Sequence, residues 1–213
     1  MAGKEYIGSR DIDLGFHIEG NAKSQTLIDV IGILEKELGF SPLSFRLFKQ
    51  VHRETGMELD PETARRTPSY DIFPMYVDLI VDHIPDDFKE TYGFNPIDET
   101  LLKRVFDNEN ARSEILFLGR LFWLPSPDVL LATKVKSYPS REKEHKRIKD
   151  MCDLIALLLF SEGWKKDSVI DLVGREIFHK FKDKEKEEDM IEASRVLDLD
   201  KDLIKNAMKK FTK

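Results

Sequence analysis

One carboxylate lies at the centre of an apolar run that is bounded by two prolines. The run, PMYVDLIVDHIP (residues 74–85), is rich in β-forming residues; Asp78 stands in its middle, and Asp82 follows on the same face. This pattern predicts a strand. A charge in such a strand is costly unless a cation lies beside it. The partner of Asp78 is therefore an arginine or lysine at the strand end, or a metal ion.

A second acidic strand is predicted earlier in the chain. In DIDLGF, residues 11–16, Asp11 and Asp13 share one face, and the residues between and after them share the other. Mg²⁺ accepts oxygen ligands, usually one or two carboxylates together with phosphates and water. A third carboxylate from a neighbouring strand completes a site for two ions. Asp11, Asp13 and Asp78 are thus the candidate ligands, although an Asp-x-Asp pair by itself also arises by chance among 40 acidic residues.

The remaining patterns indicate an α+β chain. We expect a helix over residues 24–38 that stops at Gly39, a strand region over 44–59, a loop over 60–69, and a strand-like segment over 114–125 that Gly119 interrupts. Four later segments show helical spacing: 128–138, 146–160, 167–181 and 201–211. The charged run KDKEKEED, residues 182–189, is expected to form a solvated helix or a hinge. The fold predicted is a mixed sheet with flanking helices in residues 1–124, followed by a helical bundle in residues 125–213.

Composition excludes several classes of protein. No apolar run approaches the roughly 18 residues of a membrane-spanning helix, and the N-terminus has no secretory pattern, so we expect a cytoplasmic protein that does not enter a membrane. The single cysteine, Cys152, lies in an apolar stretch and is expected to pack in a core. Neither paired histidines of the zinc type nor a serine-hydrolase pattern occurs in the sequence.

Basic residues lie near the acidic strands, although the net charge is −6. Arg46, Lys49 and Arg53 stand in one predicted strand region, and Arg65 and Arg66 stand in the following loop. They are candidates for contact with the phosphates of an RNA acceptor. Charge on the exposed face of a strand is the alternative.

Two acidic segments and a downstream block carry a resemblance to known proteins. GSRDIDLGF resembles the Ser/Thr-x-Asp-x-Asp strand of the DNA polymerase beta-like nucleotidyltransferase superfamily, and MYVDLIVD is similar to its third-aspartate strand. The block LPSPDVLLATKVKSYPSREKEHKRIKDMCDLIALL is similar to the AbiEii/AbiGii abortive-infection toxin family. This resemblance covers about residues 6–160.

The resemblance implies a role for each matching residue. Asp11 and Asp13 bind Mg²⁺, and Asp78 is the third ligand and a base for the acceptor hydroxyl. The nucleotide-binding residues would be Ser9, Lys134, Lys149, Asp150 and Asp153. Two alternatives stay open, since Lys134 also fits a surface lysine and Asp153 fits a structural salt bridge.

The resemblance also implies a nucleotidyltransferase that moves a nucleoside monophosphate from a triphosphate to a hydroxyl on RNA, a protein or a small molecule. The family name adds a toxin–antitoxin setting with an antitoxin partner. In the superfamily, a Gly-Gly or Gly-Ser pair precedes the Asp-x-Asp strand by about one helix, and its amides hold the triphosphate. Here Gly8-Ser9 stands directly before Asp11, so we expect either an incomplete N-terminus or weak or absent activity. The alternatives are a non-catalytic interaction or regulatory module with the same fold, and a metal-dependent phosphohydrolase.

Overall fold

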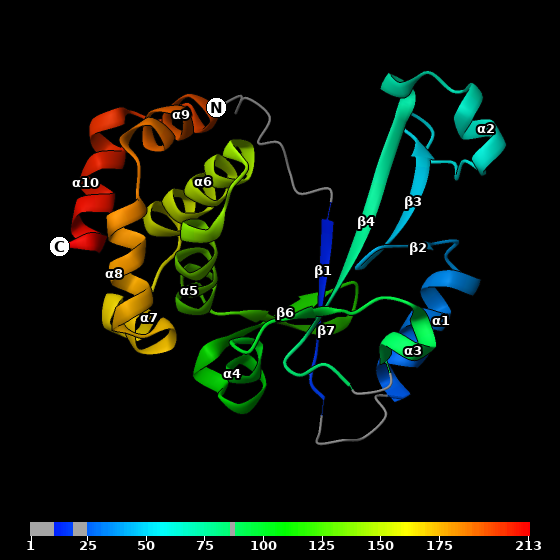
Figure 1. The fold of residues 1–213 in the computed structure, drawn as a ribbon, viewed down its shortest axis with the longest axis horizontal. Coiled ribbons are helices and arrows are strands. Elements are labelled where there is room, and N and C mark those ends of the chain that lie inside the picture. The colour runs from blue at the N-terminus through cyan, green and yellow to red at the C-terminus, as the bar shows by residue number, and fades with distance from the viewer. Residues whose placement is uncertain (1–10, 19–24, 86–87) are drawn as a thin grey trace. The chain divides into compact units, whose positions relative to one another are not determined.

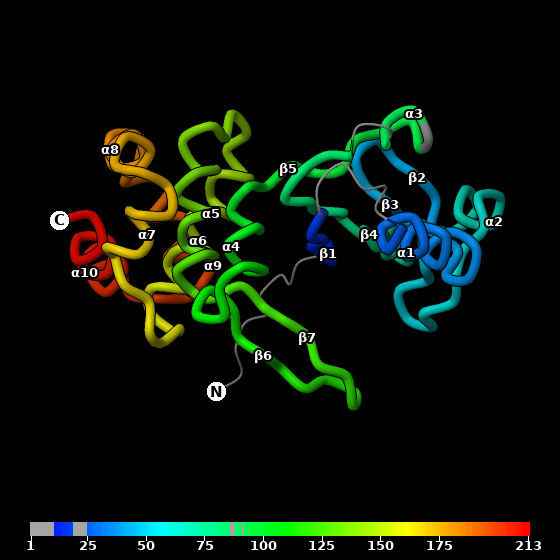
Figure 2. Tube along the Cα trace, turned by 90° about the horizontal axis from the view of Figure 1, so that it is seen from below, coloured from blue at the N-terminus to red at the C-terminus, as the bar shows by residue number. Residues whose placement is uncertain are grey.

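The computed structural model describes residues 11–18, 25–85 and 88–213. Within these residues the chain forms two compact units, one from Asp11 to Lys103 and the other from Arg104 to Lys213. The first contains a mixed sheet with helices, and the second contains a β-hairpin and a set of helices (Figures 1 and 2). The α+β class predicted from the sequence is confirmed. The domain boundary expected after residue 124 stays a prediction.

The sheet of the first unit contains parallel and antiparallel pairs. Its strands are β1 (Asp11–Phe16), β2 (Ser41–Leu43), β3 (Arg46–His52), β4 (Ile72–Val81) and β5 (Ile97–Asp98). They lie in the order β1-β4-β3-β2 (Figure 1), and β5 pairs with the end of β4. β1 and β5 run parallel to β4, while β3 runs antiparallel to β4 and to β2. β4 is therefore an inner strand, with β1 on one side and β3 on the other.

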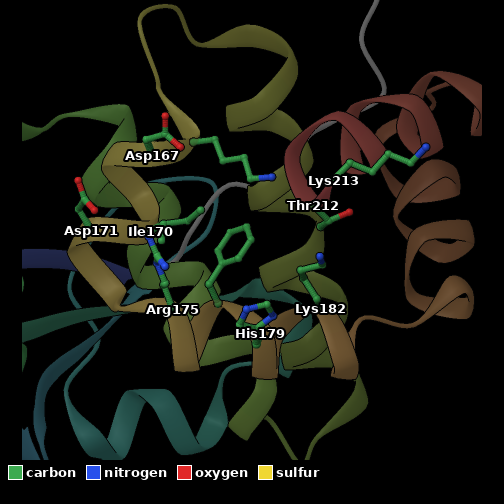
Figure 3. Close-up of a pocket in the computed structure, with 10 residues that line it drawn as sticks. Asp167, Ile170, Asp171, Arg175, His179, Lys182, Thr212 and Lys213 are labelled. Carbon is green, nitrogen blue, oxygen red and sulfur yellow. The ribbon is translucent and has the colours of Figure 1, made fainter.

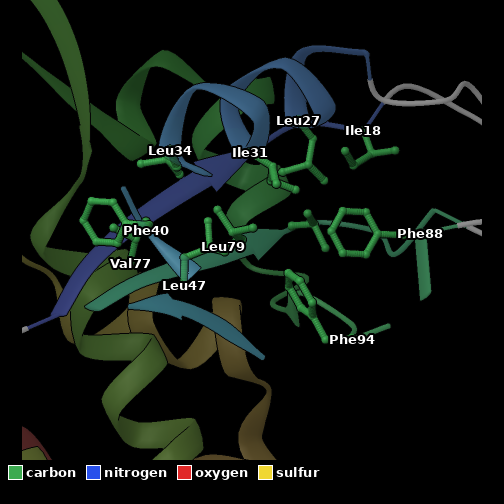
Figure 4. Packing of buried hydrophobic residues seen from close by; sticks show 11 residues of the cluster. Ile18, Leu27, Ile31, Leu34, Phe40, Leu47, Val77, Leu79, Phe88 and Phe94 are labelled. Atoms are coloured by element: carbon green, nitrogen blue, oxygen red, sulfur yellow. The ribbon is translucent and has the colours of Figure 1, made fainter. Parts of the chain in front are cut away.

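Helix α1 (Gln25–Lys36) packs on one face of this sheet. Figure 4 shows Leu27, Ile31 and Leu34 of the helix against side chains of β3 and β4. The strand residues in this cluster include Leu47, Val77, Leu79 and Val81, all buried. Burying one such side chain contributes about 1.5–3 kcal/mol. Because strand residues alternate between faces, this core directs the residues between them to the opposite face.

The segment expected to be a loop contains a helix, so that expectation was wrong. Helix α2 spans Pro61–Arg66, and the carboxylate of Asp60 accepts hydrogen bonds from the backbone amides of Glu62 (2.9 Å) and Thr63 (3.0 Å). An aspartate cap and a proline in the first turn are both signals that start a helix. Two short helices complete this part of the chain, α3 (Phe88–Tyr92) and α4 (Leu102–Asp107).

The strand-like segment that Gly119 interrupts is a β-hairpin. β6 (Arg112–Phe117) pairs antiparallel with β7 (Arg120–Pro125). Leu118 and Gly119 form the turn, with φ of 50° and 73°. Positive φ at both central residues matches a two-residue turn whose twist suits a hairpin.

Helices fill the rest of the second unit (Figure 2). They are α5 (Pro127–Ser137), α6 (Glu144–Phe160), α7 (Lys166–Val173), α8 (Arg175–Lys184), α9 (Glu187–Leu197) and α10 (Lys201–Thr212). The helical pattern predicted over 167–181 is divided at Gly174, whose φ is 83°. The charged run 182–189 spans the end of α8 and the start of α9, so it contains a connection between helices.

A buried ionic network joins α6, α9 and Tyr138, the residue that follows α5. The carboxylate of Asp189 accepts from Tyr138 Oη (2.6 Å) and from Arg147 through Nε (2.6 Å) and Nη2 (3.1 Å). Burial opposes the charge of Asp189, but the hydrogen bonds from Arg147 and Tyr138 outweigh it and lower the pKa of this carboxyl. Asp189 is only 2% exposed, so the network stabilises its carboxylate form away from solvent.

We expect Asp189→Asn to lower the free energy of unfolding at pH 7 by about 3 kcal/mol, because it leaves a partly buried guanidinium without its anion. Since the folded pKa of Asp189 is lowered, its stabilising contribution is present above the ordinary value of about 3.9 and is lost as the pH falls further. The difference between wild type and variant should therefore shrink below about pH 4. Urea unfolding at several pH values measures both effects.

Glu192→Gln provides the control for this prediction. Glu192 pairs with Arg195 at 2.6 Å, but both side chains are exposed. Exposed pairs contribute at most about 1 kcal/mol. Equal losses in the two variants at pH 7 would contradict a special role of Asp189.

Candidate functional site

Three neighbouring strands place charged residues side by side on the sheet face opposite α1. Asp13 of β1 pairs with Asp78 of β4, and Arg46 of β3 pairs with Asp78 from the other side of β4. Asp11 is two residues before Asp13 and shares its face. Residues that are paired across strands point to the same face and lie about 5 Å apart. The predicted alternation of β1 is confirmed, and it brings all three aspartates together. We call these three residues the acidic row.

Arg46 is the cation beside Asp78 in the structure. Its Nη2 donates to Asp78 Oδ2 at 2.7 Å, and its Nη1 donates to Asp11 Oδ1 at 3.4 Å. The guanidinium also lies 4.8 Å from the ring centre of Tyr76 and 4.9 Å from that of Phe45. Of the two partners expected for Asp78, the structure shows the arginine, which is the first residue of β3.

The acidic row carries more negative than positive charge. Burial raises the pKa of Asp78; Arg46 opposes this rise, while Asp13 and Asp11 add to it. Asp78 is 6% exposed, and its Oδ1 is buried without a hydrogen-bond partner among the described residues. A buried carboxylate oxygen that lacks a partner is an uncommon feature and indicates a ligand for that oxygen.

These donors suit a hard divalent cation. Mg²⁺ prefers carboxylate oxygens, and the acidic row offers three carboxylates with one buried oxygen unused. Within residues 11–18, 25–85 and 88–213, no three His, Cys, Asp or Glu side chains already converge as a metal site. Metal binding at the acidic row would therefore require side-chain movement.

Three of the other predicted site residues form a second charged cluster in the helical unit. Lys134 on α5 donates to Asp153 Oδ2 (2.6 Å) and Asp150 Oδ1 (3.3 Å), both on α6. Burial disfavours the charged lysine, but these carboxylates outweigh it and raise the pKa of Lys134. The side chain of Lys149 is exposed. Lys134 is thus fixed by an ion pair, whereas Lys149 reaches solvent.

Asp150 has partners that the sequence patterns did not indicate. Its Oδ2 accepts from Ser137 Oγ (2.9 Å) and from Arg141 Nε (2.7 Å). With Lys134 on its other oxygen, this buried carboxylate connects α5, α6 and the turn between them. The remaining predicted residue, Ser9, lies outside the described part of the chain.

Two further features shape the surroundings of the acidic row. Asp82 accepts from the Ile18 amide (2.9 Å) and lies 2.5 Å from His17 Nδ1, which ties the end of β1 to the end of β4. Gly15 faces the same side as Asp13, and a Cβ there would meet Leu102 Cδ1 at 2.9 Å. Leu102 therefore lies directly against the backbone beside the site.

A hollow of about 510 Å³ also occurs in the helical unit. Figure 3 shows Arg175, His179 and Lys182 of α8 and Asp167 and Asp171 of α7 around it. Charges of both signs line it, and none of the predicted site residues does.

Comparison with known proteins gives one structural likeness. A crystal structure of an antigenic nucleotidyltransferase-like protein from Paracoccidioides brasiliensis matches with a TM-score of 0.42 and 15% sequence identity, covering 84% of this chain and 77% of that chain. No protein-family model matches, and no curated protein matches.

One chemical prediction concerns Cys152, which is 5% exposed. Burial raises the pKa of its thiol to about 11, so the thiolate fraction at pH 8 is small. We expect an aromatic disulfide reagent to modify Cys152 at least about 100-fold more slowly than an exposed thiol. The exposed thiol is supplied by Cys152→Ser combined with Asp183→Cys. Equal rates in the two proteins would show that Cys152 is accessible.

Proposed function

We propose that this chain is a metal-dependent nucleotidyltransferase that moves a nucleoside monophosphate from a triphosphate to a hydroxyl and releases pyrophosphate. The observation that carries the proposal is the acidic row. Three carboxylates share one sheet face, and a buried oxygen of Asp78 has no partner within the described residues. Phosphoryl-type transfer requires positioning and charge stabilisation, which such a cluster provides with bound cations.

In this proposal, Asp11, Asp13 and Asp78 hold Mg²⁺, with two ions expected. When bound, the metal supplies positive charge to the triphosphate and to the attacking oxygen. Asp78 also accepts the proton of the acceptor hydroxyl.

The residues proposed to bind the nucleotide are Ser9, Lys134, Lys149, Asp150 and Asp153. In the cluster on α5 and α6, the ammonium of Lys134 is held at one place by two carboxylates. This restraint suits a lysine that contacts a triphosphate, because less side-chain freedom is lost on binding. The exposed Lys149 adds a positive charge directly before Asp150 in the sequence.

The resemblance to AbiEii/AbiGii toxins supports a narrower proposal. It favours an acceptor hydroxyl on RNA or on a protein and a toxin–antitoxin role with an antitoxin partner. A cytoplasmic location is also proposed. Within the described residues, no helix is both long and apolar enough to cross a membrane.

The test compares Asp11→Asn combined with Asp13→Asn against wild type. We expect transfer of α-labelled nucleotide, in Mg²⁺ and a cell extract that supplies RNA, protein and small-molecule acceptors, to fall by about 100-fold or more, because the ions lose two ligands. Glu37→Gln with Glu90→Gln removes the same charge from exposed positions of the same unit and should transfer normally. Unchanged transfer in the aspartate variant would end the proposal, and water as the sole acceptor would indicate a phosphohydrolase.

Arg46 favours one alternative, a non-catalytic module with the same fold. Because it already bonds Asp78 and Asp11, these carboxylates have a structural partner without any metal. Titration calorimetry of the complete gene product with the magnesium complexes of the four triphosphates separates the two functions. An enzyme binds at least one of them; absence of binding to all four favours the module.

A further inference from the structure

One guanidinium group spans two of the three carboxylates of the acidic row. Arg46 reaches Asp78 with Nη2 and Asp11 with Nη1, at 2.7 Å and 3.4 Å. Register explains this placement, since Arg46 is the residue of β3 that lies opposite Asp78. The same two carboxylates are proposed to hold the metal. A metal ion and Arg46 therefore compete for Asp78 and Asp11.

Arg46 and the two aspartates attract each other by opposite charge, but not all of their polar atoms form hydrogen bonds. Arg46 does not form a two-fold contact with one carboxylate, because its two donating nitrogens bond to different aspartates. Its Nε and Asp78 Oδ1 are both buried, and neither has a partner among the described residues. A buried polar atom without a partner is destabilising. The contact thus leaves one donor and one acceptor unsatisfied, which makes exchange for other partners favourable.

Each unsatisfied atom suits a component of a metal–triphosphate complex. Asp78 Oδ1 suits a divalent cation, and the free donor edge of Arg46 suits phosphate oxygens, which arginine binds in a two-fold manner. The rings of Phe45 and Tyr76 hold the guanidinium at 4.9 Å and 4.8 Å. These contacts can keep Arg46 near the site after it leaves the carboxylates.

We infer that Arg46 is a displaceable counter-cation: it holds Asp78 and Asp11 when the site is empty, releases them when a divalent metal binds, and then donates to the phosphates of the nucleotide. This inference rests on the proposed function and adds regulation of the same site. Metal alone binds weakly because it must displace Arg46 without providing it a new partner. A triphosphate supplies that partner, so metal and nucleotide strengthen each other's binding.

The experiment measures Mn²⁺ affinity by electron paramagnetic resonance, with and without a mixture of the four α,β-methylene triphosphates, which resist transfer. Arg46→Gln should bind Mn²⁺ alone about tenfold more tightly than wild type, which is the scale of one charge-assisted hydrogen bond. In this variant, the nucleotides should also increase Mn²⁺ affinity much less than they do in wild type. Lys36→Gln, at an exposed position of α1 and thus on the other side of the sheet, removes the same charge and should match wild type.

Arg46→Lys distinguishes displacement of the guanidinium from an effect of positive charge alone. Lysine keeps the positive charge but presents a single ammonium, which cannot span two carboxylates as a guanidinium does. We expect it to bind Mn²⁺ more tightly than wild type, though less tightly than Arg46→Gln. If circular dichroism shows Arg46→Gln to be unfolded, the lysine variant decides the question alone.

The outcomes are distinct for the two proposals. Equal Mn²⁺ affinity in wild type and both Arg46 variants overturns the role of Arg46 and leaves the nucleotidyltransferase proposal standing. Arg46→Gln could bind Mn²⁺ more tightly than wild type while Arg46→Lys does not, with the nucleotides still strengthening Mn²⁺ binding in both variants. That result would show an effect of charge only and would also overturn the role of Arg46. Failure of every protein to bind Mn²⁺, with or without nucleotide, overturns both proposals.

Discussion

The parallel pairing of β1 with β4 determines both the core and the candidate site of residues 11–103. In the observed register, apolar residues of both strands face α1, and acidic residues face the opposite side. Because side chains alternate with a period of two, a slip of one residue would place Asp78 in the core and expose Val77. Burial on one face thus fixes the positions of the charges on the other, so the site depends on the hydrophobic core for its geometry.

The fold could be predicted where a local pattern carries the signal. Alternation identified β1 and β4, and helical spacing identified α1, α5, α6 and α10. The short helix α2 was missed because its polar composition outweighed the cap at Asp60 and the proline after it. Helix α9 was also missed over most of its length, since much of it is charged; the run that includes its start was expected to be a solvated helix or a hinge. Composition is a weaker guide than capping chemistry in segments of this kind.

The site could be predicted only in part, because pairing between strands is not local. The three aspartates of the acidic row were found from alternation and from the apolar flanks of Asp78. Arg46 was noted only as a possible phosphate contact, since nothing in the sequence indicates that it lies opposite Asp78, 32 residues away. The partners of Asp150 were missed for the same reason, because they depend on how α5 and α6 pack. A search for basic residues on the strand that pairs with an acidic strand would have found Arg46.

Gly15 determines the space beside the acidic row, which the charged residues do not. Leu102 lies so close to the backbone at this position that even a methyl group would displace it. The size of residue 15 therefore sets how much room is left at one end of the row, while the aspartates set its charge. Shape and charge are controlled by different residues here, so the space at this end of the acidic row can change through residue 15 without altering any of its carboxylates.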